Sequence, residues 1–276
     1  MTAQLSVVIP AHDEAAVLPR LLDRLAGDER LEIVVVANGC TDATADVARA
    51  AGVRVVELAE GSKPAALDAG DAAATVFPRA YVDADVEVDA ATLLALADRL
   101  RRGPELVASP GVRLDLDGAT WPVRAYYRVW ELSSFRRRGH IGSGVYALSQ
   151  RGRERFGLFP KVIGDDRYVQ GLFAAEERAT TAGTFTVRPP RTLRALLARG
   201  ARIAAGNREL ERGGLAGHAP SRGRSLRELV AVMARRPALW GPFAIYAGVQ
   251  VRTGMLARRK LRRSPRSWER DETSRV

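Results

Sequence analysis

The chain has 276 residues, of which 46% are hydrophobic and 27% are charged, a balance typical of a globular protein rather than a disordered one. Cys40 is the only cysteine, which excludes an intrachain disulfide, and three histidines are too few for a histidine-rich metal site. The net charge of +11 is uneven: residues 1–187 carry 22 basic and 26 acidic side chains, and residues 188–276 carry 21 basic and 6 acidic ones. The basic last third favours an anionic partner such as a nucleic acid, a phospholipid or a diphosphate substrate.

The first part of the chain alternates between short apolar runs and amphipathic segments. Strands are predicted at Leu5–Ala11, Glu32–Ala37, Val53–Leu58, Ala80–Val82 and Leu106–Ser109. Helices are predicted at Ala15–Leu25, from a cap at Asp42 to about Ala51, at Pro64–Val76 and at Ala90–Arg101. This alternation predicts an α/β fold with a mostly parallel sheet flanked by helices on both faces. The start of the chain lacks the basic region of a signal peptide, which favours a cytoplasmic protein.

The remainder of the chain is less regular. Thr120–Phe135 is amphipathic and aromatic and predicts a helix, and a basic, glycine-rich loop follows at Arg136–Gly144. Gly213–Arg224 has the composition of a linker. Pro237–Val251 carries no charge and would form a helix about 22 Å long, whereas a membrane span needs roughly 20 residues. We therefore expect this segment to lie on a surface rather than to cross a bilayer.

Polar side chains follow three of the predicted strands, at the end where an open α/β sheet binds its ligands. His12, Asn38 and Asp83 hold these positions, and Asp85 lies two residues beyond Asp83. Carboxylate oxygens suit Mg²⁺ or Mn²⁺, which usually also takes oxygens from substrate phosphates. Asp83 and Asp85 are therefore predicted to hold a divalent cation that stabilises charge on a departing diphosphate. A solvated acidic turn has the same composition, but the apolar strand that leads into this one favours the metal site.

Other candidate residues carry two interpretations each. Asp165 and Asp166 lie near the start of a predicted helix, where carboxylates either cap the helix or act as a general base on an acceptor hydroxyl. Lys63 opens another predicted helix and can pair with a phosphate, pair with a neighbouring acid or lie in solvent. His12 and Glu14 can contact a base or a ribose, or can simply belong to a loop.

Five segments, in their order and spacing, resemble the signature motifs of the family 2 glycosyltransferases. They are Val8–Glu14 (VIPAHDE) for the opening P-x-[YH]-N/D-E motif, Asn38–Thr44 (NGCTDAT) for the second-strand motif, Gly61–Gly70 (GSKPAALDAG) for the G-K-x-x-A-L-N-x-G helix, Asp83–Asp85 for the D-x-D motif and Gly164–Asp166 for the E-D pair. Ala201–Asn207, which contains Arg202, loosely resembles the late arginine motif of the family. The likeness covers about residues 4–210.

The resemblance implies a GT-A-type, Rossmann-like fold and a metal-dependent hexosyltransferase. Such an enzyme moves a sugar, with inversion, from a nucleotide-diphosphate sugar to an acceptor hydroxyl. The resemblance makes Asp166 the catalytic base and makes Asp83 and Asp85 the ligands of Mg²⁺ or Mn²⁺. The residues it assigns to the donor are Pro10, His12, Glu14, Asn38, Lys63, Asp83, Asp85 and Arg202. The expected acceptor is a glycan or a lipid-linked intermediate of the cell envelope, because the C-terminal tail has the composition of a membrane-seeking segment.

The chain departs from the family pattern at three places. Ala37 and Asn38 replace the acidic pair that touches the nucleobase in many relatives, so the resemblance does not imply a uridine donor. Asp165 replaces the usual glutamate. The late arginine motif lacks its tryptophan, and the chain lacks several long apolar spans, which argues against a processive synthase.

The predicted organisation is a GT-A glycosyltransferase domain at 1–212, with a nucleotide-sugar half at about 1–115 and an acceptor half at about 116–212, and a linker with a basic amphipathic helical extension at 213–276. The extension combines Trp240, Phe243, Ile245 and Tyr246 with the polybasic stretch Arg252–Arg263. Apolar insertion together with a basic patch predicts peripheral docking on the cytoplasmic face of a membrane. The alternative is a C-terminal helix that packs on the catalytic core.

Two other classes of function compete with glycosyl transfer. Gly142–Ala147 matches the G-x-G-x-x-A pattern of a dinucleotide-binding oxidoreductase, but the residues before it do not form a buried strand. The basic last third and the aromatic Tyr126, Tyr127 and Trp130 suit a nucleic-acid-binding protein, yet their spacing favours a helix packed on the sheet, and no nucleic-acid partner is expected. A non-catalytic relative with the same fold is disfavoured because Asp83, Asp85 and Asp166 are all present.

Overall fold

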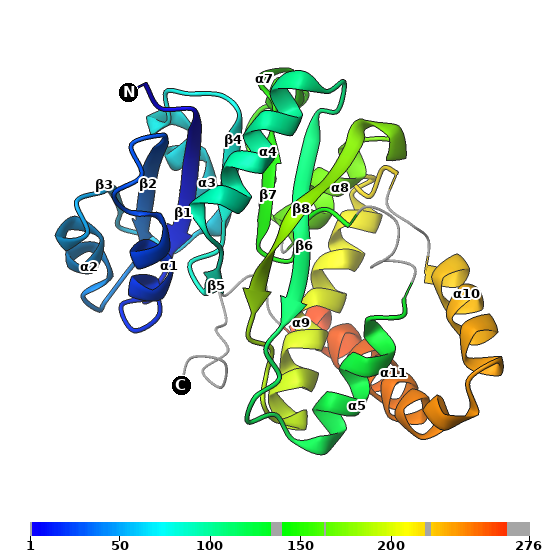
Figure 1. Ribbon diagram of the computed structural model, residues 1–276. Coiled ribbons are helices and arrows are strands. Elements are labelled where there is room, and N and C mark those ends of the chain that lie inside the picture. The colour runs from blue at the N-terminus through cyan, green and yellow to red at the C-terminus, as the bar shows by residue number, and fades with distance from the viewer. Residues whose placement is uncertain (1, 134–139, 163, 219–221, 264–276) are drawn as a thin grey trace.

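The computed structural model describes residues 2–133, 140–162, 164–218 and 222–263. Its centre is an eight-stranded sheet with the order β3-β2-β1-β4-β7-β6-β8-β5 (Figure 1). The strands are β1 (Leu5–Ala11), β2 (Leu31–Asn38), β3 (Arg54–Leu58), β4 (Arg79–Val82), β5 (Val86–Glu87), β6 (Val107–Leu114), β7 (Val145–Leu148) and β8 (Arg178–Val187). β7 runs antiparallel to β4 and β6, and β5 runs antiparallel to β8, whereas the other pairings are parallel. The predicted α/β class with a mostly parallel sheet is confirmed.

Helices cover both faces of the sheet because alternate strand residues point to opposite sides. The α-helices are α1 (Leu18–Leu25), α2 (Thr44–Ala50), α3 (Lys63–Ala73), α4 (Ala90–Arg102), α5 (Trp121–Trp130), α7 (Gln150–Arg153), α8 (Asp165–Leu172), α9 (Leu193–Arg212), α10 (Arg222–Ala234) and α11 (Trp240–Arg263), with short 3₁₀ turns at Ala175–Glu177 and Pro237–Leu239. α1, α2 and α4 bury their apolar stripes with Val7 and Ile9 on one face. α3 and α8 pack on the other face, where Val8 and Leu67 lie. β1, β2 and β4 run parallel, so the predicted site residues that follow their carboxyl ends lie at one edge of the sheet.

The loop before α2 differs from the prediction in one detail. α2 begins at Thr44, and its N-cap residue is Ala43 rather than Asp42. Asp42 instead accepts hydrogen bonds from the backbone N–H of Thr44 at 3.0 Å and of Ala15 at 3.1 Å. Asp42 therefore ties the loop that follows β2 to the loop that follows β1, and so orders the rim of the sheet where the site lies.

The C-terminal helix packs on the protein. α11 lies along α9 and α5 at one end of the molecule (Figure 1). Tyr246 stacks on Tyr126 with ring centroids 5.1 Å apart, and Phe243 and Ile245 are partly buried against apolar clusters. These three side chains are half-buried against protein, which favours the alternative of a helix that packs on the core, whereas Trp240 is 61% exposed. Within the described residues, no helix has both the length and the apolar character needed to cross a bilayer.

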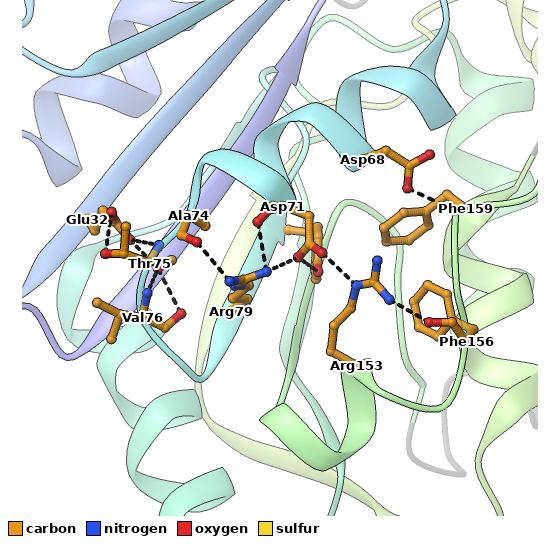
Figure 2. A network of polar contacts seen from close by, with 12 residues as sticks. Glu32, Asp68, Asp71, Ala74, Thr75, Val76, Arg79, Arg153, Phe156 and Phe159 are labelled. Carbon is orange, nitrogen blue, oxygen red and sulfur yellow. Dashed lines mark hydrogen bonds and ion pairs between the residues drawn. The ribbon is translucent and has the colours of Figure 1, made fainter.

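A buried charge network lies behind the site, and Figure 2 shows Asp71 between Arg79 and Arg153. Asp71 Oδ1 lies 2.7 Å from Arg79 Nη1, and its Oδ2 lies 2.9 Å from Arg153 Nε. The hydroxyl of Tyr81 also donates to Asp71 Oδ1 at 2.7 Å. Tyr81 in turn stacks on Tyr146 at 5.1 Å, so the network fixes the aromatic floor beneath the site.

Asp71→Asn is expected to lower the free energy of unfolding by about 3 kcal/mol, because it leaves two buried guanidinium groups without their counter-charge. Urea denaturation measures the change. The control is Asp46→Asn, where an 80% exposed carboxylate pairs with Arg49 on the surface, and we expect a change within about 0.5 kcal/mol. Equal losses in the two variants would contradict a structural role for the network.

Candidate active site

A lysine and two carboxylates meet at the carboxyl ends of the central strands. Lys63 is the first residue of α3, which Ser62 caps, and its Nζ lies 2.7 Å from Asp83 Oδ1 and 2.9 Å from Asp165 Oδ1. Asp83 follows β4 directly, and Asp165 is the first residue of α8. The structure therefore joins three predicted site residues that lie far apart in the sequence.

The electrostatics of this cluster follow from burial and like charge. Burial raises the pKa of Asp83 to about 6, and the nearby Asp165 adds to the rise while Lys63 opposes it. Burial alone would lower the pKa of Lys63, but Asp165 and Asp83 outweigh it and hold the pKa of Lys63 above its ordinary value. The single ammonium group of Lys63 thus faces two carboxylates, which leaves room in the charge balance for a further cation beside them.

The Asp83-Ala84-Asp85 turn presents its two carboxylates differently. The backbone N–H of Asp83 donates to the carbonyl of Gly144 at 2.8 Å, which turns Asp83 toward Lys63, whereas Asp85 is exposed at the rim. In the described residues, no third acid, histidine or cysteine joins them in a preformed metal cluster. Two carboxylates with open positions fit Mg²⁺ or Mn²⁺, which commonly complete their shell with water and substrate phosphates.

A glycine-rich loop presses against the turn and against Asp166. Gly142 has φ = +113° and Gly144 has φ = +112°. A Cβ on Gly142 would lie 2.6 Å from Asp166 Cβ, and one on Gly144 would lie 2.7 Å from Val86 Cγ1. Only glycine allows this close approach. The loop leads into β7 and does not connect a strand to a helix, so it is not a dinucleotide-binding turn. The predicted residues 136–139 of the loop lie outside the described residues.

Asp166 is held by backbone donors. Its Oδ2 accepts from the N–H of Ser143 at 3.1 Å, and its Oδ1 accepts from the N–H of Arg167 at 2.7 Å. Asp166 lines both a small hollow with Lys63, Asp83 and Asp165 and a larger cleft between α5 and α9. Asp166 thus borders both the small hollow and the larger cleft. A carboxylate between two neighbouring binding spaces is well placed to act as a general base.

The loops after β1 and β2 build the predicted nucleotide side. His12 Nδ1 lies 2.7 Å from the carbonyl oxygen of Asn38, and the side-chain oxygen of Asn38 accepts from the N–H of Ser62 at 2.6 Å. Asn38 is fully buried, so it braces the entry to α3. The N–H of Glu14 donates to Thr44 Oγ1 at 2.7 Å, and Glu14 is also buried. Contact of His12, Glu14 and Asn38 with a nucleotide stays a prediction.

Two further predicted donor residues lie in different places. Pro10 is near the end of β1 and lines the small hollow beside Lys63 and Asp83. Arg202 is on α9, and it lines neither the small hollow nor the larger cleft. Arg199, one turn earlier on α9, does line the cleft. Contact of Arg202 with the donor stays a prediction.

Tyr146 is a site residue that the sequence analysis missed. It lies on β7 and lines the small hollow, and its buried hydroxyl has no hydrogen-bond partner among the described residues. Burial raises the pKa of Tyr146 well above its ordinary value, and the negative charge of Asp165 adds to this rise. The only signal in the sequence was the short apolar run Val145–Leu148, which is too brief to mark a strand by periodicity.

Comparison with known proteins assigns the chain to a family. Residues 6–151, more than half of the chain, match the model described as Glycosyl transferase family 2, and the chain belongs to that family. It is 37% identical over 117 residues to uncharacterized glycosyltransferases of Mycobacterium tuberculosis and Mycobacterium bovis, a stretch that makes up 42% of this chain and 52% of each relative. The chain thus spans about half the length of the curated relatives it matches.

Solved structures agree on the fold. A mannosyltransferase from Pyrobaculum calidifontis in complex with GDP-mannose and Mn²⁺ is 19% identical, with a TM-score of 0.67 over 95% of this chain and 88% of that chain. Glucosyl-3-phosphoglycerate synthase from Mycobacterium tuberculosis, in complex with Mn²⁺, UDP and glucosyl-3-phosphoglycerate, is 22% identical, with a TM-score of 0.56 over 79% of this chain and 81% of that chain. The predicted GT-A-type fold is confirmed.

Proposed function

We propose that the chain transfers a sugar from a nucleotide-diphosphate sugar to an acceptor hydroxyl, with inversion at the anomeric carbon. The observation that carries the proposal is the position of Asp166, which borders both the Lys63–Asp83–Asp165 cluster and the open cleft. The donor lies on the cluster side and the acceptor on the cleft side. Family membership and the similar solved structures that hold nucleotide sugars and Mn²⁺ support the same assignment.

Four residues in or beside the cluster have a task in this reaction. Asp83 and Asp85 would hold Mg²⁺ or Mn²⁺, which neutralises charge on the leaving diphosphate. Lys63, fixed between Asp83 and Asp165, places a second positive charge where the diphosphate binds. Asp166 takes the proton of the acceptor hydroxyl as its oxygen bonds to the anomeric carbon and the bond to the diphosphate breaks. A single displacement of this kind inverts the configuration.

A donor screen tests the function directly. Purified protein with Mn²⁺ is incubated with UDP-, GDP- and dTDP-sugars, and release of the nucleoside diphosphate is measured. We expect donors of one nucleotide class to be hydrolysed slowly when no acceptor is present. Because Asn38 stands where many relatives have an acid that touches the base, the preferred base need not be uracil. Absence of both hydrolysis and binding for every donor would contradict the proposal.

We further propose that the acceptor belongs to cell-envelope glycan or glycolipid synthesis and that the protein works on the cytoplasmic face of a membrane. The support is a face of α11 that exposes Val251 and Met255 beside Arg252, Arg258 and Arg259. Apolar insertion and basic charge together give peripheral anchoring. Trp240, one of the side chains first predicted to insert, is also exposed at the start of α11. The side chains from residue 260 onward lie outside the described residues.

Vesicle flotation tests this localisation. The protein is expected to float with anionic liposomes and to float less at high salt, because salt screens the arginines. The double variant Val251→Glu with Met255→Glu should lose most of the flotation. The control is Leu158→Glu, at a 79% exposed position outside α11, and this variant should float like the parent protein. Equal flotation of the two variants would leave α11 as ordinary surface.

A further inference from the structure

We propose that the small hollow beside the Lys63–Asp83–Asp165 cluster receives one hydroxyl group of the donor sugar, and that the phenol of Tyr146 recognises this hydroxyl. The proposal rests on the proposed function, since it places the sugar of the donor on the cluster side of Asp166. Tyr146 lies in none of the five segments that resemble the family motifs. Its part in choosing the donor sugar is therefore argued from the structure of this chain alone.

The hydroxyl of Tyr146 is a buried polar group with an unmet hydrogen bond. The side chain lies on β7, is 2% exposed and stacks on the ring of Tyr81. The hydroxyl of Tyr81 donates to Asp71 at 2.7 Å, whereas that of Tyr146 has no hydrogen-bond partner among the described residues. Folded proteins rarely leave a buried hydroxyl unpaired, because its lost hydration is not repaid. A ligand that offers an acceptor atom to Tyr146 would recover this cost when it binds.

Tyr146 shares the hollow with the charged residues of the candidate active site. Lys63, Asp83, Asp165 and Asp166 line the same space. Burial raises the pKa of Tyr146 well above its ordinary value, and the negative charges of Asp165 and Asp166 raise it further. The phenol therefore keeps its proton and offers a hydrogen bond at the place where these carboxylates meet. It needs an acceptor, and the acceptor has to enter the hollow with a ligand.

The size and charge of the hollow favour a hydroxyl over a phosphate oxygen. Its free volume is about 10 Å³, which is room for about one water-sized group. Three carboxylates, those of Asp83, Asp165 and Asp166, line it beside the one ammonium of Lys63, so an anionic oxygen would be repelled. A sugar hydroxyl is neutral and can accept from Tyr146 while it donates to Asp165. The diphosphate then lies beside the hollow, and an acetamido group is too large to enter it.

Thermal unfolding of the full chain without ligand is the first test. Tyr146→Phe removes only the hydroxyl, and we expect it to unfold at the temperature of the parent protein or above, because an unpaired buried polar group is lost. Tyr81→Phe is the contrast and should unfold at a lower temperature, since it removes a hydroxyl that donates to Asp71. A loss in Tyr146→Phe as large as that in Tyr81→Phe would show that the hydroxyl has a permanent partner, such as a buried water, and would overturn the proposal.

Calorimetric binding with Mn²⁺ and no acceptor is the second test. The probes are UDP-glucose, GDP-mannose and dTDP-glucose, each beside its nucleoside diphosphate. For the donor that the parent binds most tightly, Tyr146→Phe should weaken binding about tenfold, as expected for a lost hydrogen bond in a buried site. Affinity for the nucleoside diphosphate alone should not change. The matched control is Tyr168→Phe, a buried phenol of the same apolar cluster that lines neither the hollow nor the cleft, and it should bind both like the parent.

Monodeoxy analogues of the same donor sugar identify the hydroxyl. The parent should bind one analogue at least about tenfold more weakly than the full sugar, and this ratio should shrink severalfold in Tyr146→Phe, because the two changes remove the same contact. Equal weakening of the donor and of the bare diphosphate in Tyr146→Phe would overturn the assignment to the sugar. Unchanged donor affinity in a parent-like background of diphosphate binding would overturn this proposal alone. A parent protein that binds no diphosphate and no donor would instead contradict the proposed function on which it rests.

Discussion

Asp166→Asn is expected to lower kcat for sugar transfer by at least about a hundredfold, which is the usual contribution of a general base. The substitution keeps an oxygen that can accept from the N–H of Ser143 or Arg167, so the loop around it should stay in place. It removes only the ability to take a proton. The loss should therefore fall on kcat, with the affinity for the donor unchanged, as expected for an interaction made in the transition state.

The measurement pairs steady-state transfer with calorimetric binding of the donor nucleotide. Asp117→Asn, at an exposed position on the loop before α5, serves as the matched control and should behave like the parent protein. A kcat near that of the parent in Asp166→Asn would move the role to another group, with Asp165 the next candidate. Asp165 pairs with Lys63 at 2.9 Å, whereas Asp166 accepts from the backbone N–H groups of Ser143 and Arg167.

The residues of the Lys63–Asp83–Asp165 cluster could be predicted as candidates because their signals are local. Asp83 follows an apolar strand, and Lys63 and Asp165 open helices, so each position could be read from a few neighbouring residues. Their meeting was not readable from spacing, because the lysine joins carboxylates 20 and 102 positions away. The rule that the strand ends of a parallel sheet meet at one edge predicted the region in which these residues lie. The ion pairs between them could be seen only in the structure.

The strands β7 and β8 escaped the sequence analysis for physical reasons. β7 has four residues, and a run so short gives no periodicity. β8 (RATTAGTFTV) is rich in threonine and largely open to solvent on one side, so its apolar pattern is weak. Both strands exist through pairing with distant segments, such as Tyr81 with Tyr146 and Val107 with Arg178. Non-local pairing of this kind overrides local propensity.

The cleft between α5 and α9 was the part of the candidate site that the sequence could not predict. Its walls come from α5, β6 and α9, and α11 completes the aromatic packing through Tyr246. The helical spacing of Tyr126, Tyr127 and Trp130 predicted that they pack inward, and they do so against α9 and α11 rather than against the sheet alone. The two alternatives for Phe243, Ile245 and Tyr246 could not be separated for the same reason, since an uncharged helix face fits a membrane and a protein surface equally well.

Asp85→Ala is expected to abolish turnover while the protein stays folded. Asp85 is exposed on the turn between β4 and β5, so its removal breaks no buried contact and should leave the temperature of unfolding nearly unchanged. Asp83 already pairs with Lys63, which leaves Asp85 as the carboxylate with most freedom to hold the cation. Without it, the departing diphosphate loses the charge that stabilises it.

Three measurements decide the matter for Asp85. Turnover is followed across a titration of Mn²⁺, binding of Mn²⁺ is measured with the nucleoside diphosphate present, and unfolding is followed by heat. Asp98→Ala, at an exposed carboxylate 3.9 Å from Arg102, is the control and should keep both activity and metal binding. The parent protein should lose activity in EDTA and regain it with excess Mn²⁺ or Mg²⁺, because the carboxylate pair and the diphosphate form the metal site only together. Full activity in EDTA would show that Asp83 and Asp85 serve the donor without a metal, and Lys63 would then be the group that carries the charge of the leaving diphosphate.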